Sequence, residues 1–402
     1  MRCDFQPDCK DESDETECET VTLPPAYKSN IPPRPAFSTP DTPAHPISLH
    51  ITVLSLEIVT GKMEIVMDFI AMLRWTDPRL VFRDLKHDQA TNALQLSALR
   101  SLWVPQVSFS NAKGNAHTLL DEETKGLVLR HGEARPGDHT HAREVDFFGG
   151  EENPVVASRK YSATYRCSLD LTLYPFDTQE CNFVFLLTSA RKERLQMVRD
   201  GKGVTYSGSR QLLEYSIVSI VTRPANHTRY SALQAIVRFR RRYGFAILTV
   251  YTPSCFFVII AYLTTFYPLS NLQVRVVIAL TAMLVLTTLL SQVSSNLPRN
   301  SYFKALDVWM FGAIGLIFSI LILQTVVDVV ARGEEASKVS PKQDKGMVHV
   351  ESSIMGPRKT AEDLFPRTLL APRMMRAMQV GYPAVTFGLV VAYVAYLFAA
   401  LN

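Results

Sequence analysis

The chain has 402 residues, of which 47% are hydrophobic and 20% are charged, and its formal net charge is +4 at pH 7. This length excludes a peptide or a small disulfide scaffold and allows two or more domains. The nearly balanced charge argues against a nucleic-acid partner, because nucleic-acid-binding domains carry a marked positive surface. The sequence contains no HExxH, nucleophile-elbow or glycine-rich phosphate-loop motif, so we expect neither an enzyme nor a required cofactor.

The first 21 residues are acidic and contain the run CDFQPDCKDESDETEC. This run resembles the carboxy-terminal half of an LDL-receptor class A module. The resemblance implies a partial module over 1–21 in which Cys3 pairs with Cys18 and Cys9 lacks a partner. It also implies a possible Ca²⁺ site, since Ca²⁺ prefers carboxylate oxygens; an acidic, metal-free tail is the alternative. The implied calcium ligands are Asp4, Asp8, Asp14 and Glu15.

The next segment, 22–46, contains eight prolines. Proline-rich sequence favours an extended backbone, so we expect a stiff linker here. No signal peptide precedes the acidic segment, and we expect that a targeting segment has been removed.

Between residues 47 and 242 the sequence consists of short segments in which apolar and polar side chains alternate, separated by Pro, Gly and Asn. Alternation of period two is typical of a strand with one buried face. Several such strands predict an antiparallel β-sandwich with Ig-like topology. Asn226 begins an Asn-His-Thr glycosylation sequon in this part. The predicted strands are 47–59, 63–75, 161–173, 181–187, 215–221 and 232–239.

Four runs without Asp, Glu, Lys or Arg follow, at 245–271, 276–298, 308–327 and 377–402. Each is long enough to cross about 30 Å of hydrocarbon as a helix of about 20 residues. We therefore expect three transmembrane helices within 243–330 and a fourth within 377–402. Segment 331–376 holds nine Lys/Arg and six Asp/Glu, which predicts a cytoplasmic loop. The expected protein is a multi-pass plasma-membrane protein with both termini outside.

The second apolar run carries a polar stripe at helical spacing. A face of Thr and Ser suits a water-filled pore, although these hydroxyls could instead bond to their own helix or to a neighbouring one. One helix cannot enclose a pore, so several subunits would contribute one each, and a ring of Leu284 would be a hydrophobic gate. The stripe consists of Val277, Thr281, Leu284, Thr288, Ser291 and Ser295.

Cys167 and Cys181 flank thirteen residues that include Tyr174, Pro175, Phe176 and Asp177. They form either a disulfide, stabilising the fold by about 3 kcal/mol, or a pair of buried thiols. The Cys-x13-Cys segment with Tyr-Pro-Phe-Asp resembles the signature of the Cys-loop, or pentameric ligand-gated, ion channels. Further motifs in the same order resemble those of this family: Trp75-Thr76-Asp77, Trp103-Val104-Pro105, Asn111-Ala112-Lys113-Gly114 and the segment 297–302.

The resemblance implies a disulfide between Cys167 and Cys181 and a homo- or heteropentamer in which this chain has four partner subunits. An extracellular agonist site would lie between neighbouring sandwiches, and a central pore, surrounded by membrane lipid, would pass permeant ions. Agonist-driven movement would be relayed to the gate by residues at the end of the sandwich and between the second and third helices. These coupling residues are Tyr174, Pro175, Phe176, Asp177, Arg240, Arg241, Pro298 and Arg299.

Many family members hold a cationic amine among aromatic faces. The corresponding positions here are Ile70, Ser110 and Thr188, none of them aromatic. Phe109 and Tyr230 complete the expected agonist site, with Tyr230 the plausible aromatic contributor. A typical amine agonist is therefore not expected, and the agonist is unassigned.

Before the stripe the chain reads Gln273-Val274-Arg275. A pore-lining ring of Arg275 would favour anions, which is our expectation; an Arg275 turned away from the axis would leave selectivity open. One alternative is a proton- or metal-gated cation channel that uses His131, His139 and His141. Another is a non-conducting accessory or adhesion subunit.

Overall fold

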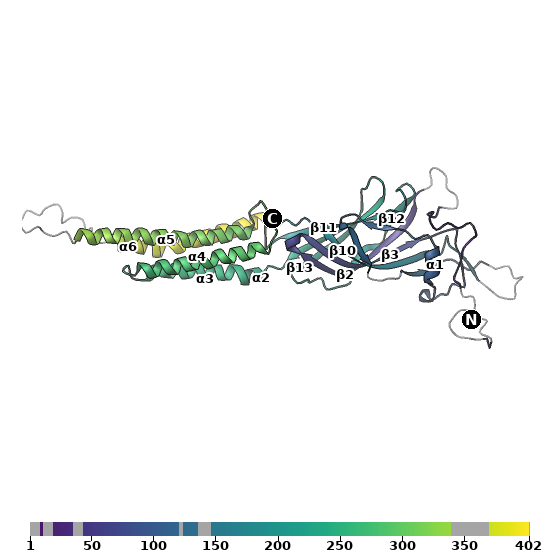
Figure 1. The fold of residues 1–402 in the computed structure, drawn as a ribbon, viewed down its shortest axis with the longest axis horizontal. Coiled ribbons are helices and arrows are strands. Elements are labelled where there is room, and N and C mark those ends of the chain that lie inside the picture. Colours follow the sequence, from purple (N-terminus) through teal and green to yellow (C-terminus); the bar gives the residue numbers. More distant parts are fainter. Residues whose placement is uncertain are drawn as a thin grey trace, which may run out of the picture. The chain divides into compact units, whose positions relative to one another are not determined.

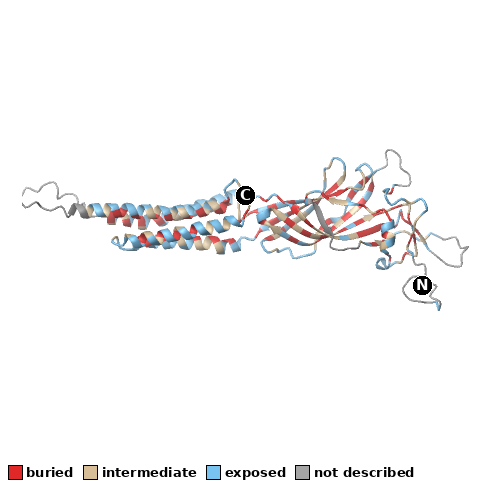
Figure 2. Cartoon of the chain, in the orientation of Figure 1, coloured by how far each residue is buried: buried red, intermediate tan, exposed pale blue. Residues whose placement is uncertain are grey.

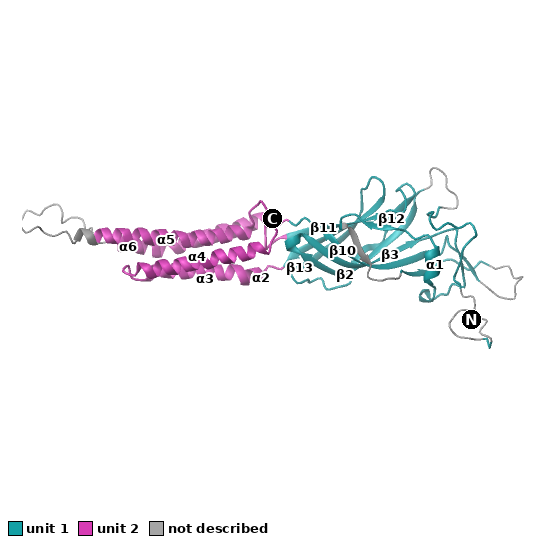
Figure 3. Cartoon of the chain, viewed as in Figure 1, with its two compact units in different colours: residues 1–169, 178–241 teal, residues 170–177, 242–402 magenta. Residues whose placement is uncertain are grey.

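The computed structural model describes residues 9–10, 19–34, 43–119, 124–135, 146–338 and 370–401. The chain divides into two compact units, shown in different colours in Figure 3. One unit comprises residues up to 169 together with 178–241, and it holds all the strands. The other comprises residues 170–177 and 242–402, and it holds the long helices.

Within the described residues, the strands of the first unit form three sheets. A seven-stranded sheet has the order β12-β2-β3-β10-β8-β5, with β7 also paired to β10, and a four-stranded sheet has the order β13-β14-β11-β6. A small sheet joins β1, β4 and β9. The strands are β1 Val21–Thr22, β2 His45–Val59, β3 Glu64–Trp75, β4 Val81–Arg83, β5 Ala93–Leu94, β6 Val107–Phe109, β7 Ala112–Leu119, β8 Lys125–Val128, β9 Phe147–Gly149, β10 Val155–Arg166, β11 Thr178–Leu187, β12 Leu195–Tyr206, β13 Tyr215–Ala225 and β14 Ser231–Arg241, and a short helix, α1, spans Leu96–Ser101.

The predicted β-sandwich is confirmed, with differences in detail. The predicted strand 161–173 ends at Arg166 and begins earlier, at Val155. β12, absent from the prediction, pairs with β2 in the parallel sense, whereas only antiparallel pairing was expected. Its residues after Val198 are mostly polar or glycine, so the alternating pattern of a half-buried strand is interrupted there.

The sandwich core follows from the alternation along β3. Odd-numbered side chains from Ile65 to Trp75 are buried, while their even-numbered neighbours are intermediate or exposed; Figure 2 colours this burial along the chain. Phe69 is fully buried, with its ring centroid 5.2 Å from that of Phe109 and 5.6 Å from that of Tyr161. The rings therefore join side chains of β3, β6 and β10 in one apolar layer.

Parts of the expected stiff linker over 22–46 pair or pack with the strands. Val21 and Thr22 pair with β4, and β2 begins at His45. Tyr27 accepts a hydrogen bond from the Trp103 amide (2.9 Å) and donates one to Asp77 (3.1 Å), and burial raises the pKa of Tyr27 to about 12. The described part of this segment therefore packs on the sandwich.

In the second unit, four described helical segments are long and apolar enough to span a membrane: 244–266, 272–295, 305–334 and 370–401. The first is built from α2 (Gly244–Ala246), a π-helical stretch (Ile247–Tyr251), α3 (Thr252–Leu263) and a terminal 3₁₀ turn (Thr264–Phe266). The others are α4 (Leu272–Ser295), α5 (Ala305–Lys338) and α6 (Leu370–Leu401), labelled in Figure 1. The π-helical stretch ends beside Pro253, which has no amide hydrogen for a regular helical bond. α4, α5 and α6 begin before the uncharged runs, and α5 also ends after its run, so Arg275, Asp328 and Arg332 lie within helices. The first segment and α4 end earlier than their runs, at Phe266 and Ser295.

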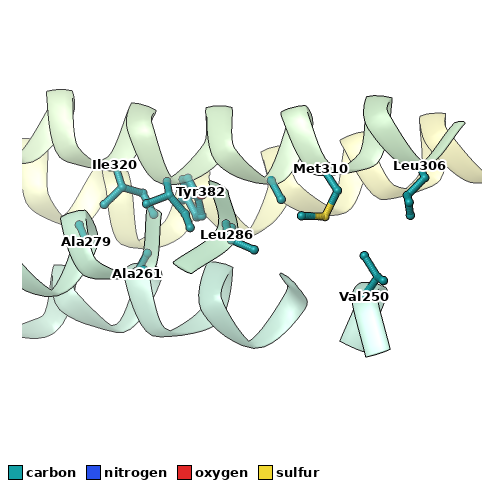
Figure 4. Packing of buried hydrophobic residues seen from close by; sticks show 11 residues of the cluster. Val250, Ala261, Ala279, Leu286, Leu306, Met310, Ile320 and Tyr382 are labelled. Carbon is teal, nitrogen blue, oxygen red and sulfur yellow. The ribbon is translucent and has the colours of Figure 1, made fainter. Parts of the chain in front are cut away.

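The helices pack around a hydrophobic seam to which α3 and α4 contribute alanines (Figure 4). Ala261 of α3, Ala279 and Ala282 of α4, and Ile317 and Ile320 of α5 are buried in one cluster. Small side chains at such an interface let helices approach closely. The orientation of α4 within the bundle is thereby fixed.

Phe69→Ala is expected to destabilise the sandwich by about 3–5 kcal/mol, because it removes a fully buried ring. Met72→Ala, on the same strand at a position 38% exposed, is the control and is expected to change stability by less than about 1 kcal/mol. The measurement is the thermal unfolding midpoint of the purified chain. Equal midpoints for the two variants would show that the ring cluster is not central to the fold.

Candidate functional site

One face of α4 is exposed in the part of the chain that the structure describes. All six residues of the predicted polar stripe are exposed, with Val277 at 51% and Leu284 at 64% exposure. The opposite face, with Ala279, Ala282 and Leu286, is buried against the other helices. A mixed apolar and hydroxyl face that no described residue of this chain covers can contact water, lipid or another subunit.

The hydroxyls on this face also bond to their own helix. Thr281, Thr288 and Ser295 donate to the carbonyl oxygens three residues earlier, at 2.7–2.8 Å. This satisfies the hydroxyl protons within the helix and leaves the oxygen lone pairs on the exposed surface. The two interpretations of the stripe are therefore compatible: the hydroxyls bond to their own helix, and they also form a polar face.

The prediction that Arg275 lies on this face is wrong. Arg275 precedes Val277 by two residues, which turns its side chain by about 200° around the helix. The side chain is 0% exposed, and Nη2 donates to the Leu269 carbonyl at 3.5 Å. Asp328 of α5 interacts with it electrostatically and also pairs with Arg332 at 2.9 Å. A buried guanidinium needs such an anionic neighbour.

Gln273 occupies the exposed face in place of Arg275. It is exposed and lies four residues before Val277, close to one helical turn. No carboxylate occurs along α4. The sequence analysis missed Gln273, although the helical period alone identifies it.

The expected agonist positions are divided between the two main sheets. Thr188 directly follows β11 and Tyr230 directly precedes β14, and the register pairs their neighbours Leu187 and Ser231. These two residues therefore lie side by side at one end of the four-stranded sheet. Ser110 lies further along the same sheet, where its amide donates to the Val184 carbonyl at 3.0 Å.

Phe109 and Ile70 do not join this group within one chain. Phe109 is 3% exposed and belongs to the sandwich core, so its predicted role as an agonist contact is wrong. Ile70 lies on β3 in the seven-stranded sheet and points away from the core, opposite to Phe69. It could meet Thr188 and Tyr230 only across an interface between two copies.

Tyr230 already has polar neighbours. The His227 ring stacks at 5.7 Å and the Arg229 guanidinium carbon lies 5.8 Å from the ring centroid. His227 Nδ1 also accepts the backbone amide of Tyr230 at 3.1 Å. A positive arginine beside the aromatic ring disfavours a cationic ligand there.

The disulfide between Cys167 and Cys181 is confirmed. The tip of the loop it closes belongs to the helical unit. There, the Leu171 amide donates to the Tyr302 hydroxyl at 3.0 Å, and the amides of Ala305 and Leu306 donate to the carbonyls of Thr172 (2.8 Å) and Tyr174 (3.2 Å). The loop is thus bonded directly to the start of α5.

Comparison with known proteins identifies the family. A model of the neurotransmitter-gated ion-channel ligand-binding domain matches residues 21–243, and a model of the transmembrane region of the same channels matches residues 250–380. The chain belongs to the neurotransmitter-gated ion-channel family. The predicted Cys-loop receptor relationship is thereby confirmed, and the family consists of ion channels rather than enzymes.

Three curated relatives are each identical to this chain at about a quarter of the aligned positions. It is 25% identical to the serotonin-gated chloride channel mod-1 of Caenorhabditis elegans, over 75% of this chain and 58% of the relative. It is 26% identical to pH-sensitive chloride channel 2 of Anopheles gambiae, over 73% and 46%. It is 25% identical to the glutamate-gated chloride channel of Drosophila melanogaster, over 76% and 63%. The matched region therefore spans about half to three fifths of these relatives.

In this member of the family, an aromatic cluster that the sequence analysis missed adjoins the Cys-loop tip. Phe176 lies 5.4 Å from Tyr243 and 6.2 Å from Tyr251, measured between ring centroids. Tyr251 continues to Trp309 of α5 (5.3 Å), which contacts Tyr393 of α6 (5.1 Å). The Tyr251 and Tyr393 hydroxyls are 2.8 Å apart. These rings connect the loop to three helices, and their wide spacing in the sequence hides the cluster.

The remaining coupling residues have separate surroundings. Arg241 is buried in the sandwich, 3.5 Å from Glu214 and 4.4 Å above the Tyr215 ring. Arg240 and Arg299 are exposed, Pro298 is half-buried, and Asp177 is buried. The structure therefore brings the predicted loop residues 174–176 to the helices and holds Arg241 within the strand unit.

Some predicted sites lie outside the described residues: the calcium ligands Asp4, Asp8, Asp14 and Glu15, and His139 and His141. His131 is exposed, and its amide donates to Asn153 at 2.9 Å. Among the described residues, no group of three or more His, Cys, Asp or Glu could hold a metal ion.

A thiol placed on the exposed face of α4 is expected to react readily with a charged methanethiosulfonate. The background carries Cys9→Ser and Cys255→Ser, because both cysteines are exposed and would otherwise react themselves. Thr281→Cys and Ser291→Cys should react quickly in the assembled particle, because the thiolate that reacts forms only in water. The measurement is the mass shift with time.

Two controls define the environment. Ala282→Cys places a thiol in the buried seam (3% exposed), and Phe387→Cys places one on an exposed apolar position of α6 (71%); both should react slowly. Equal rates at 281 and 387 would show that the α4 face contacts lipid.

Proposed function

We propose that this chain is one subunit of a pentameric channel that opens when a ligand binds outside the cell and that conducts anions. The observation that carries this proposal is the exposed face of α4, which presents hydroxyls and leucine and no carboxylate. Membership of a family of ligand-gated channels supports conduction. The accessory-subunit alternative has no comparable feature in its favour.

Assembly into a ring follows from what one chain lacks. A single polar-faced helix cannot enclose water in a membrane, so copies of α4 must share an axis. The predicted agonist positions are likewise divided, with Ile70 in one sheet and Thr188 and Tyr230 in the other. Both features are completed by neighbouring subunits around a closed ring, which we take to be a pentamer as in the family.

Anion selectivity is supported by the electrostatics of α4 without a pore-facing arginine. The amino end of α4 carries no side-chain cap, and a helix amino terminus is equivalent to about half a positive charge. Several such ends at the cytoplasmic mouth, with neutral Gln273 on the exposed face, favour anions. The relatives named above as chloride channels point the same way.

The ligand is proposed to be something other than a simple amine. Ser110 and Thr188 provide no aromatic faces, and Arg229 adjoins the remaining ring, Tyr230. The named ligands of the relatives comprise an amine, an amino acid and protons, so they do not select one. The effect of ligand binding would be transmitted to the gate through the Cys-loop tip. Carbonyl oxygens of this tip accept hydrogen bonds from backbone amides at the start of α5.

Two further features remain proposals: glycosylation of Asn226 and the partial module at the amino terminus. Asn226 is exposed in the β13–β14 connection, as glycosylation at its sequon requires. The partial LDL-receptor class A module over 1–21, with its possible calcium site, is also retained as a proposal.

Leu284→Thr provides a test of conduction that needs no agonist. Replacing the hydrophobic ring with hydroxyls lets water fill the constriction, so constitutive current is expected. Its reversal potential should shift by about 59 mV for each tenfold change in chloride and should ignore replacement of sodium by a large cation. Voltage clamp of expressing cells makes the measurement. A reversal potential that follows sodium would refute anion selectivity, and a silent channel with normal surface expression would favour the accessory role.

The two residues at the cytoplasmic end of α4 should behave differently in the same Leu284→Thr background. Gln273→Glu adds a carboxylate to the exposed face and should shift the reversal potential toward that of cations. Arg275→Gln removes a buried positive charge that interacts electrostatically with Asp328 and should leave the reversal potential unchanged while lowering surface expression. If Arg275→Gln alone altered selectivity, the guanidinium would have to face the pore.

A further inference from the structure

A ligand-sized cavity lies within the strand unit, between β12 and β13. These are the edge strands of the seven-stranded and four-stranded sheets, respectively. The cavity has a volume of about 520 Å³, which suits a small molecule. No residue of the predicted agonist site lines it.

An irregular segment of β12 forms one wall of this cavity. Arg199 pairs with Leu49 and Val204 with Ile51, so the four residues 200–203 lie opposite a single residue of β2. Such a bulge re-aims side chains and is frequent beside functional sites. Here it carries Lys202 toward β13, where the Lys202 carbonyl accepts a hydrogen bond from the Thr222 hydroxyl at 3.1 Å.

Glycine is needed to form this bulge. Gly201 and Gly203 have φ values of +55° and +76°, which side chains disfavour. A Cβ on Gly203 would lie 2.8 Å from Cγ2 of Thr222. The geometry of the cavity wall is therefore specified by the sequence Asp-Gly-Lys-Gly.

The charged residues that line the cavity are all positive. Arg199, Lys202 and Arg210 all line it, and its lining includes no Asp or Glu. The two nearest acidic residues in the sequence are engaged elsewhere: Asp200 with Arg74 of β3 at 2.9 Å, and Glu214 with Arg241 of β14 at 3.5 Å. A concave surface with charges of one sign concentrates the field and attracts ions of the opposite sign.

The remaining lining is partly hydroxyl and partly apolar. Thr205 and Ser219 can donate hydrogen bonds to an anion, and Ile217 and Ile220 provide apolar surface. Arginine and lysine recognise carboxylate, sulfate and phosphate groups by charge-assisted hydrogen bonds. The charged group of an amphipathic anion could therefore contact the basic and hydroxyl side chains, and its apolar part could contact the isoleucines.

We infer that this cavity binds a small organic anion, with its charged group held by Arg199, Lys202 and Arg210 and its apolar part against Ile217 and Ile220. The site lies within one subunit and is distinct from the agonist site. The inference goes beyond the proposed channel function and does not depend on it, because binding can be measured without current.

The test is equilibrium dialysis of the purified full chain in lipid nanodiscs against radiolabelled benzenesulfonate, at constant ionic strength. We expect saturable binding, and no saturable binding of the neutral analogue benzenesulfonamide. Lys202→Gln/Arg210→Gln should weaken benzenesulfonate binding at least about tenfold, because charged hydrogen bonds are lost. Arg223→Gln, which removes an exposed charge from β13 outside the cavity, is the matched control and should bind like the original chain.

Two further variants keep the result interpretable. Gly203→Ala should also weaken binding, since it displaces the bulge without changing net charge. Arg210→Gln alone alters an exposed residue and replaces the double variant if that one unfolds in a thermal melt. Absence of binding by the original chain, equal binding of the neutral analogue, or an equal loss in Arg223→Gln would each overturn the inference.

Discussion

The rotation of α4 about its own axis is the constraint on which the functional account depends. Ala279, Ala282 and Leu286 are buried in the helix bundle, and their contacts determine which face of α4 remains free. A turn of half a revolution would bury Thr281 and Ser291 and expose Arg275. The small side chains of the seam therefore decide both the polarity of the free face and its lack of charged groups.

Helical periodicity placed the six stripe residues on one face from the sequence alone, and all six are exposed in the structure. A 3.6-residue repeat needs no knowledge of the partner helix. The prediction failed at Arg275, where position near the mouth was given more weight than angle. Asp328, the negative charge near Arg275, lies on another helix and is distant in the sequence. Long-range proximity of this kind leaves no local pattern, and the same is true of the Tyr251, Trp309 and Tyr393 cluster.

In the sandwich, strand β3 could be predicted from its alternating sequence because one of its faces is apolar throughout. Strand β12 could not be predicted, because its polar bulge interrupts the alternation of apolar and polar residues. Its parallel pairing with β2 also depends on residues about 150 positions away in the sequence. Likewise, the prolines after residue 22 suggested a linker, whereas Tyr27 docks against Asp77 and Trp103. Phe109 was expected beside Ser110 in the agonist site but is buried in the core, because successive strand positions face opposite sides of a sheet.

Electron cryo-microscopy of the full chain in lipid nanodiscs tests the central claim most directly. The account predicts five copies arranged around one axis, with Thr281, Leu284 and Ser291 directed toward that axis and Arg275 directed toward α5. A monomeric particle, or an assembly in which this face of α4 meets acyl chains, would contradict it.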